Sequence, residues 1–475
     1  MSFRKNFFKN LLISGGYNYL TQLVTFVASF ITSRLLSPGD FGIVGLIAVF
    51  SGFITIFSDS GLSMAVIRSG YKHTYYRGLN YLSILIGCGL CIAMILLMYP
   101  MALFYENTDI VLPGIAIAFL FIIKSLSVVP MAVLQKELRF GASGRILFIS
   151  TFCGTLSTII MAYAGLKHWS LIWSQYITAI VSFIILYFYA PGLLAKTRAK
   201  TIKKSFVLAK TLIKSLVGFN IINYWARNAD NLIVGKYYGT SDLGIYNRAY
   251  MMLMMPLNLI TGIFSAVLLP SFVKHKNEGG DVESEYYFIL KIISLINLPV
   301  AIILILFPQQ LVELLWGNNW LKVAALLPYF GLLVMTQTLI STLGSIMVVQ
   351  KEERSLMYAG WVGAAFMVIG IVFGATISLN GIAAFYSLAY ILLVLPFNVI
   401  YIIKSKLRFI SSLYIFWLPK IILSIIMWLA IYNNLHWLLI SGLLIWVALT
   451  FANARIEIKK AFQFFSMASR RLSKT

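Results

Sequence analysis

Charged residues are scarce in this chain, and acidic residues are the scarcest. Only 11% of the 475 residues are charged, with 15 acidic residues against 38 basic ones. A soluble domain of this length carries more charge, because charged side chains cover the surface that faces water. With 60% hydrophobic residues, the chain instead has the composition of a protein dissolved in a lipid bilayer.

Cysteine and histidine are also few, and they form no pattern typical of a metal or catalytic site. Cys88, Cys91 and Cys153 lie inside apolar segments, where cysteine is an ordinary core residue. The four histidines lie in connectors, and no glycine-rich phosphate loop is present. We therefore expect no metal, no cofactor and no catalysed reaction.

The net charge of +23 raises the question of nucleic-acid binding. The basic residues, however, lie in short connectors between apolar runs, where they orient helices in a membrane and contact anionic lipid headgroups. We expect membrane lipids, and no nucleic acid, as the partners of this charge.

About fourteen apolar runs are long enough to cross a bilayer. They lie near residues 11–33, 42–67, 79–102, 110–135, 145–165, 169–190, 212–235, 243–272, 286–308, 322–349, 356–378, 381–403, 411–432 and 436–453. The first run follows basic residues as a signal peptide does, but it lacks a small-residue cleavage site, so we keep it as the first helix. The sequence predicts an all-α integral membrane protein.

Basic residues fall on alternate connectors. They concentrate in 68–77, 136–145, 196–214 and the C-terminal tail, whereas the opposite connectors hold only Arg34, Lys167, Lys236 and Lys322. Positive charge stays on the cytoplasmic side of a membrane. We therefore expect a multi-pass protein of the bacterial inner membrane with both termini in the cytoplasm.

Two stretches of the chain resemble each other at a constant spacing. Gly16-Tyr17-Asn18 matches Gly218-Phe219-Asn220, and Asp40-Phe41-Gly42-Ile43 matches Asp242-Leu243-Gly244-Ile245; residue numbers 18 and 220, like 40 and 242, differ by 202. The spacing contains six predicted helices, so the copies are parallel, as in many transporters. We predict a six-helix lobe in 1–190, a basic cytoplasmic linker in 191–211, a second lobe in 212–403, two further helices in 404–453 and a basic tail in 454–475.

Polar and charged side chains inside predicted helices mark a candidate cavity, because burying them in lipid is costly. One stripe holds Asn220, Asn223, Arg227, Asp230 and Asn231, and the matching stripe holds Asn18, Thr21, Gln22, Thr25, Ser29 and Thr32. Lys124 lies midway along the fourth predicted helix. Alternatively, Arg227 and Asp230 neutralise each other, and the stripes are packing faces between helices.

Other intramembrane charges leave two interpretations open. Arg34, Lys236 and Arg248 lie near outer helix ends, where they either line the cavity or extend to the headgroups, and Lys420 resembles them. Asp59 either binds a coupling ion, as Asp230 also could, or caps its helix. A cavity lined by these cations suits an anionic substrate, and guanidinium groups suit phosphate.

The sequence resembles the polysaccharide-transporter branch of the multidrug/oligosaccharidyl-lipid/polysaccharide flippase superfamily, and within it the Wzx-type exporters. The resemblance rests on 15–17, on 33–42, on Asp59-Ser60-Gly61-Leu62, on Arg227 to Gly244, and on Trp316-Gly317-Asn318-Asn319-Trp320.

The resemblance implies two six-helix lobes and alternating access. It also implies a flippase that carries an undecaprenyl-pyrophosphate-linked oligosaccharide of O-antigen, capsule or exopolysaccharide to the outer leaflet. A lipid II flippase or a small-molecule antiporter of the same superfamily is the alternative. We expect a monomer, and a polysaccharide polymerase is an open partner.

Overall fold

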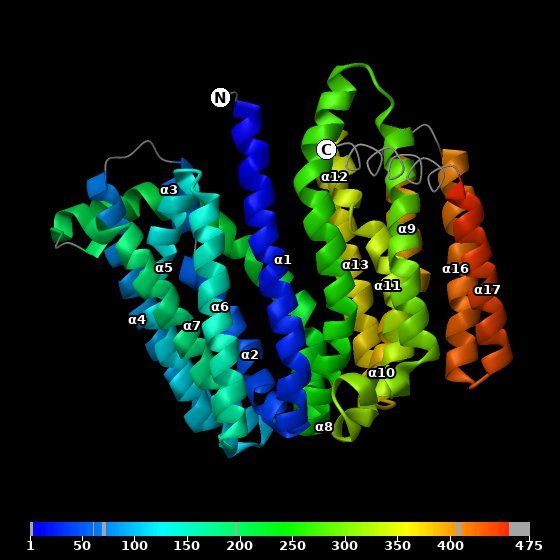
Figure 1. The fold of residues 1–475 in the computed structure, drawn as a ribbon, viewed down its shortest axis with the longest axis horizontal. Coiled ribbons are helices and arrows are strands. Elements are labelled where there is room, and N and C mark those ends of the chain that lie inside the picture. The colour runs from blue at the N-terminus through cyan, green and yellow to red at the C-terminus, as the bar shows by residue number, and fades with distance from the viewer. Residues whose placement is uncertain (1–2, 60, 69–72, 195–196, 405–409, 456–475) are drawn as a thin grey trace, which may run out of the picture. The chain divides into compact units, whose positions relative to one another are not determined.

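The computed structural model describes residues 3–59, 61–68, 73–194, 197–404 and 410–455, although the side chains of some helical residues, such as 208–223, lie outside the description. Every regular element in these ranges is a helix (Figure 1). The chain divides into two compact units. The first holds the residues up to Asn247 together with Leu315–Asn319, and the second holds Arg248–Leu314 and the residues from Trp320 onward.

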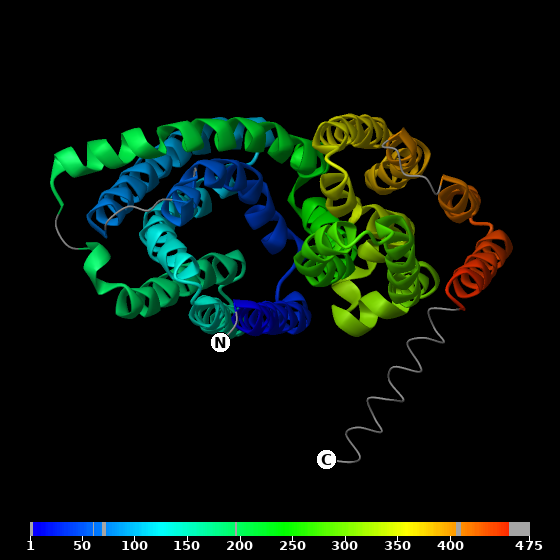
Figure 2. The same cartoon turned by 90° about the horizontal axis from the view of Figure 1, so that it is seen from above.

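The first unit consists of long helices packed side by side. Its elements are α1 (Phe3–Leu35), α2 (Pro38–Asp59), α3 (Leu62–Arg68), α4 (His73–Tyr105), η1 (Thr108–Ile110), α5 (Val111–Lys136), α6 (Phe140–Tyr163), α7 (His168–Tyr189), η2 (Pro191–Leu194) and the first part of α8 (Ala199–Asn277). Helix α4 packs on α5, α5 and α6 pack on α7, and α1 packs on α6 (Figure 2). Small residues permit this packing, as where Gly154 of α6 meets Thr178 of α7.

The second unit continues with the remainder of α8. It contains α9 (Val282–Leu306), α10 (Pro308–Leu315), η3 (Asn318–Ala325), α11 (Leu327–Ile340), α12 (Leu343–Val349), α13 (Glu353–Ala375), α14 (Leu379–Ala389), the π-helical segment η4 (Tyr390–Val394), α15 (Leu395–Lys404), α16 (Ile410–Tyr432) and α17 (His436–Asn453). Helix α9 packs on α11, α13 packs on α14, and α16 packs on α17.

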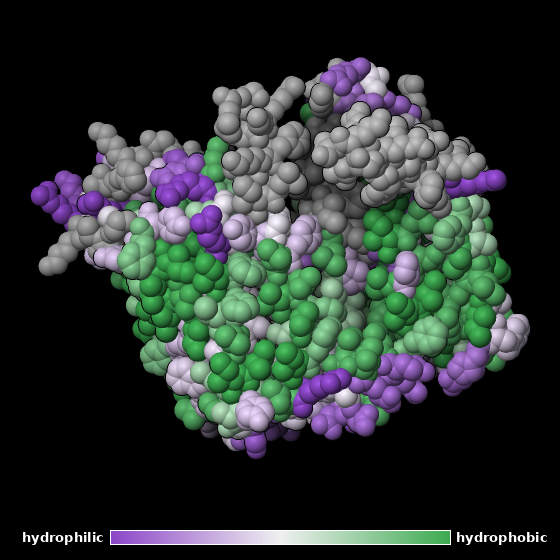
Figure 3. Space-filling model, in the orientation of Figure 1, coloured by the Kyte–Doolittle hydropathy of each residue, from purple (hydrophilic) through white to green (hydrophobic). Residues whose placement is uncertain are grey.

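The predicted all-α membrane class is confirmed. Among the described residues, ten helical segments are long and apolar enough to cross a membrane, and Phe416–Tyr432 is a shorter apolar helix. The predicted spans 11–33, 212–235 and 243–272 lie in α1 and α8. Hydrophobic side chains gather along the middle of the helices and hydrophilic ones at their ends, as Figure 3 shows for one face.

Some predicted boundaries are wrong. Helix α8 begins at Ala199 rather than near 212, and the span predicted from 322 begins at Leu327, because Asn318–Ala325 form the separate element η3. The short helix α10 was not predicted. Spans 42–67 and 322–349 are each divided into two helices, and 381–403 contains the π-helical segment.

The repeat recurs in the backbone. Helix α1 ends at Leu35 and α2 begins at Pro38, with Ser37 in the corner. The residue 202 positions after Ser37 is Gly239, where α8 is broken by a φ of 81° and a ψ of −173°. Glycine suits this corner because side-chain-bearing residues rarely adopt such a positive φ. The two copies therefore turn at equivalent positions.

The two corners also contact each other reciprocally. A Cβ on Gly42 would lie 1.7 Å from the carbonyl oxygen of Thr240, and a Cβ on Gly244 would lie 2.0 Å from that of Pro38. Pro38 and Thr240 are 202 residues apart, as are Gly42 and Gly244. The contact is therefore symmetric between the copies, and it brings backbone against backbone only because both glycines lack a side chain.

Candidate functional site

Helix α1 has two exposed stripes on opposite sides. Leu20, Leu23, Val27 and Ile31 form an exposed apolar stripe. Asn18, Gln22 and Thr25 are exposed about 180° around the helix. Helix α6 covers the surface between them, where Gly144 meets Tyr17. The apolar stripe suits lipid, so the polar stripe is the candidate cavity face.

Toward its C-terminal end, the polar stripe of α1 becomes buried. Ser29 and Thr32 are only 7% and 6% exposed. Their hydroxyls donate to backbone carbonyls of the preceding turn, as those of Thr21 and Thr25 do. The threonine and serine hydroxyls are thus satisfied within α1, which leaves Asn18 and Gln22 as the groups suited to bind a ligand.

Lys124 is exposed on a face of α5 that differs from the apolar one. Leu112 and Phe119 are the strongly exposed apolar side chains of this helix. Lys124 lies about 140° around the helix from Phe119. Its neighbour Ser125 is fully buried against Gly87 of α4. Lys124 thus lies on a face of α5 that is separate from the exposed apolar one, and its place in a cavity stays a prediction.

Arg227 is exposed on α8, and aromatic residues hold this part of α8 against α2. The ring centroids of Phe53 and Trp225 are 5.1 Å apart, and those of Phe53 and Tyr224 are 5.9 Å apart. Tyr224 also donates its hydroxyl to the carbonyl of Val49. Arg227 itself remains exposed beside this aromatic cluster.

Asp230 does not neutralise Arg227. The structure has no ion pair between these two described side chains. Asp230 is 4% exposed, and its carboxylate accepts hydrogen bonds from the Tyr246 hydroxyl at 3.1 Å and the Asn231 amide at 2.8 Å. The bond to Tyr246 joins the two parts of α8 across Gly239. Tyr246 is among the residues that carry the family resemblance, but the sequence did not predict its bond to Asp230, because the break at Gly239 is what brings the two side chains close.

The predicted cations near helix ends have three different environments. Lys236 donates to Glu106 at 2.7 Å, and this contact holds the pKa of Glu106 below its usual value. Arg248, in the second unit, is 7% exposed and lies 5.4 Å from the Trp320 ring centroid, so it is buried rather than extended to headgroups. Arg34 is exposed and lines a pocket with Lys167 and His168.

Of the two interpretations that the sequence leaves open for Lys420, the one in which it extends to the headgroups is wrong. Lys420 is 1% exposed, and its ammonium donates to Ser294 at 2.9 Å and lies 3.8 Å from the Phe416 ring centroid. The packing of α9, α16 and α17 around it covers the whole side chain.

Three predicted site residues cannot be placed. The side chains of Asn220, Asn223 and Asp59 lie outside the described residues. Among the candidates that are described, no hydrogen bond or ion pair joins Asn18, Lys124 and Arg227 to one another. The first unit therefore presents exposed polar groups on α1, α5 and α8 as separate contributions to one candidate site, and their common use stays a prediction.

Solved structures share this fold. The lipid II flippase MurJ, in an inward closed conformation, superposes with a TM-score of 0.68 at 16% identity, covering 94% of this chain and 100% of MurJ. The MATE multidrug transporter DinF-BH has a TM-score of 0.54 at 12% identity, covering 85% of this chain and 96% of DinF-BH. This chain therefore has the helical fold that these two structures share.

The chain belongs to the polysaccharide biosynthesis protein family, whose profile matches residues 31–325. The lipopolysaccharide biosynthesis protein WzxC of Escherichia coli (strain K12) is 23% identical over 343 residues, 68% of this chain and 65% of WzxC. The teichuronic acid biosynthesis protein TuaB of Bacillus subtilis (strain 168) is 23% identical over 327 residues, 67% of this chain and 66% of TuaB. The chain thus spans just under two thirds of these two relatives.

Proposed function

We propose that this chain is a flippase for a lipid-linked oligosaccharide. It moves an undecaprenyl-pyrophosphate-linked repeat unit of O-antigen, capsule or exopolysaccharide from the cytoplasmic to the outer leaflet of a bacterial inner membrane. The saccharide is carried without chemical change. Both termini lie in the cytoplasm, and one chain suffices for transport because it holds both copies of the repeat.

One joint observation carries the proposal. A polysaccharide biosynthesis profile matches residues 31–325, on a fold that a lipid II flippase shares over 94% of the chain. Family membership points to glycan assembly, and the fold points to transfer of a lipid-linked headgroup across a membrane.

The side chains of the first unit suit such a headgroup. Lys124 and Arg227 are exposed cations, and no carboxylate among the described residues lies within ion-pair distance of either. A guanidinium binds two phosphate oxygens at once, and an ammonium binds phosphate as a point charge. The amides of Asn18 and Gln22 suit sugar hydroxyls. A net cationic surface inside a membrane favours an anionic ligand over a cationic drug.

Alternating access is the proposed mechanism. The reciprocal contact of Gly42 and Gly244 joins the two equivalent corners of the repeat within the first unit. In the proposed mechanism, transport requires these two corners to separate. The movement is a change between packed arrangements, as expected of a transporter built from a repeat.

The test is a gene deletion with complementation in the source bacterium. Surface glycan is measured by immunoblot, and the lipid-linked oligosaccharide on each leaflet is quantified by enzymatic labelling of right-side-out and inverted membrane vesicles. We expect loss of surface glycan, accumulation on the cytoplasmic leaflet, and recovery with the wild-type gene. Normal surface glycan in the deletion strain would refute the proposal.

A lipid II flippase is the second candidate, since the structural likeness to MurJ covers nearly the whole chain. The two functions separate in a strain depleted of its own lipid II flippase. An oligosaccharide flippase fails to restore growth there, whereas a lipid II flippase restores it.

A further inference from the structure

A polar pocket lies where the corner between α1 and α2 meets the start of α7. Its volume is about 630 Å³, and its lining includes Arg34, Ser37, Asp40, Lys167, His168 and Asn319. All of these residues belong to the first unit. Arg34 and Ser37 of the lining come from the end of α1 and from the corner before α2. Figure 1 shows that this end of α1 lies opposite the N-terminus, which is the outer side in the proposed topology. Its volume is in the range of small-ligand sites.

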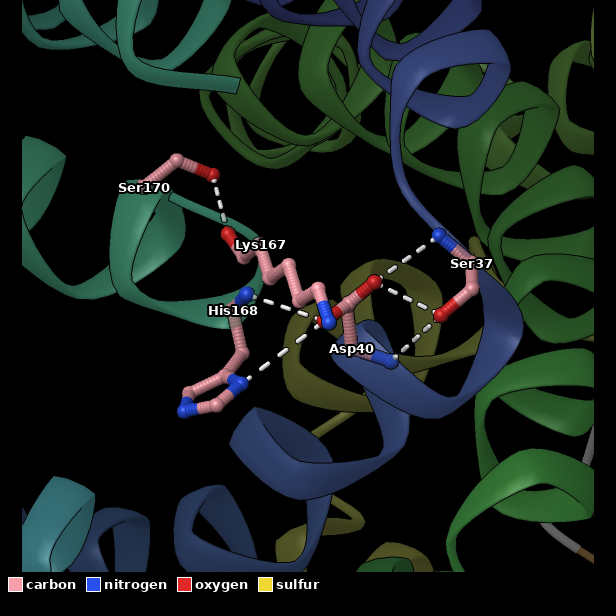
Figure 4. A network of polar contacts seen from close by, with 5 residues as sticks. All are labelled: Ser37, Asp40, Lys167, His168 and Ser170. Atoms are coloured by element: carbon pink, nitrogen blue, oxygen red, sulfur yellow. Dashed lines mark hydrogen bonds and ion pairs between the residues drawn. The ribbon is translucent and has the colours of Figure 1, made fainter. Parts of the chain in front are cut away.

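Asp40 fixes the walls of this pocket, as Figure 4 shows. One carboxylate oxygen accepts from the Ser37 amide at 3.0 Å and the Ser37 hydroxyl at 2.6 Å, while the Asp40 amide bonds back to Ser37. This reciprocal pattern is a helix capping box. The other oxygen accepts from the His168 amide at 3.0 Å and lies 3.6 Å from its Nδ1. The acid is therefore occupied by protein donors and joins two corners that are far apart in sequence.

Lys167 is held in an unusual backbone conformation at the pocket. It has a φ of 48° and a ψ of −136°, a region that favours glycine, although the position holds a lysine. The bond from the next amide, that of His168, to Asp40 stabilises this turn. Both Lys167 and Arg34 are exposed, so the lining carries two cations against one acid whose oxygens are already bonded.

We propose that this pocket binds a phosphate-class anion on the outer side of the membrane, and that its ligand is the pyrophosphate of the lipid-linked oligosaccharide after transfer. The identity of the ligand rests on the proposed function, whereas the anion site follows from the lining. Arg34 supplies a bidentate donor and Lys167 a point charge, while the side chain of Asn319 completes the polar wall. A receptive site at this end lowers the free energy of the delivered headgroup and delays its return.

The anion site is tested by calorimetry on the full chain in nanodiscs of zwitterionic lipid, with inorganic pyrophosphate and then farnesyl pyrophosphate as probes. We expect binding of both by the wild type. Lys167→Gln and Arg34→Gln should each weaken binding about tenfold or more, as loss of a charged hydrogen bond does. Lys322→Gln, which removes a basic residue outside the pocket lining, is the matched control and should bind as the wild type does.

Lys167→Gly separates binding from folding, because glycine accepts the positive φ without strain. We expect it to keep the thermal unfolding midpoint of the wild type or raise it, and to lose binding as Lys167→Gln does. Unchanged binding in Lys167→Gly, Lys167→Gln and Arg34→Gln would overturn the proposal.

The source of the anion is tested by adding phosphatidylglycerol to the nanodiscs. If the ligand is the pyrophosphate of the substrate, farnesyl pyrophosphate binding should persist. Full displacement would assign the pocket to bulk anionic lipid and overturn the substrate assignment. Surface glycan in cells separates the two proposals. If all the pocket variants bind and export as the wild type does, the anion site is refuted and the flippase proposal stands. If the wild-type gene supports no export, the flippase proposal is refuted and the anion site stands.

Discussion

At the scale of the residue, Arg227 and Lys124 are the side chains whose loss should stop transport without unfolding the protein. Both are exposed, so little packing is lost in Arg227→Ala or Lys124→Ala. We expect each variant to reduce surface glycan at least tenfold, because a charged hydrogen bond contributes about 1.5–3 kcal/mol. Complementation of the deletion strain measures the effect.

Membrane insertion and folding need a separate measurement for these variants. Fluorescence size-exclusion chromatography should give wild-type monodisperse peaks, and Lys200→Ala, an exposed lysine in the first turn of α8, serves as control. Normal export by both variants, or aggregation of both, would contradict their assignment to the cavity.

Lys420 should behave in the opposite way, as a packing residue. A buried cation whose ammonium donates to a single hydroxyl gains little from its charge, so Lys420→Met should unfold at the wild-type temperature or above. Lys420→Ala leaves a cavity between α9, α16 and α17 and should lose about 2–4 kcal/mol of stability. Thermal unfolding in detergent measures both. Equal destabilisation by methionine and alanine would mean that the ammonium group itself is required.

Sequence reasoning at this scale succeeds where a charge lies on an exposed face and fails where distant helices cover it. The helical period predicted a polar side of α1 and a cavity position for Lys124; the polar side chains of α1 and Lys124 are exposed there, and their role in a cavity stays a prediction. It could not tell that Trp320 lies against Arg248 or that Ser294 contacts Lys420, because each of these partners is far along the chain. Phe416, by contrast, lies one turn before Lys420 on the same helix α16. The capping box of Ser37 and Asp40 was readable from its spacing and was missed.

At the scale of the element, the reciprocal glycine contact should control closure between the copies of the repeat. In Gly42→Ala the new Cβ would lie 1.7 Å from a backbone oxygen, and in Gly244→Ala 2.0 Å. Backbone cannot yield as a flexible side chain does, so the corners must move apart, at a cost of about 1–3 kcal/mol. We expect a lower unfolding temperature and a more accessible Thr32, which is 6% exposed in the wild type.

Accessibility is measured with Thr32→Cys in a chain whose three native cysteines are replaced by alanine. A membrane-impermeant maleimide should label this cysteine several-fold faster when Gly42 or Gly244 is alanine. Gly89→Ala is the control, since a Cβ there meets nothing within 4 Å. Equal labelling in the Gly42→Ala, Gly244→Ala and Gly89→Ala chains would mean that neither Gly42 nor Gly244 controls closure.

At the scale of the element, sequence reasoning located the helices but did not predict a change of helix type within one short segment. Apolar runs located the helices, and the 202-residue spacing predicted from the sequence also makes Gly239 the equivalent of Ser37 in the structure. The π-helical segment Tyr390–Val394 was not anticipated, although Pro396 lies two residues after it. Proline lacks an amide hydrogen and disturbs the hydrogen bonds of the preceding turn, so the apolar run continues while the helix type changes.

At the scale of the whole molecule, composition and charge distribution predicted the class of protein, since solvent preference is a property of the whole chain. For the anionic substrate of the proposed function, the membrane potential gives transport a direction. A cell interior that is negative favours outward movement of an anion by about 2.3 kcal/mol per charge per 100 mV. An anionic headgroup could therefore be exported by uniport.

We accordingly predict that transport responds to membrane potential alone. In proteoliposomes with a fluorescent prenyl-pyrophosphate-linked saccharide, a valinomycin-induced potassium diffusion potential that opposes the anion should slow its transfer, and the reversed potential should accelerate it. Neither a sodium nor a proton gradient should be needed. A rate that ignores potential and requires one of these gradients would instead assign energy coupling to a carboxylate, and Asp230, buried beneath the Tyr246 hydroxyl, would be the first to replace with asparagine.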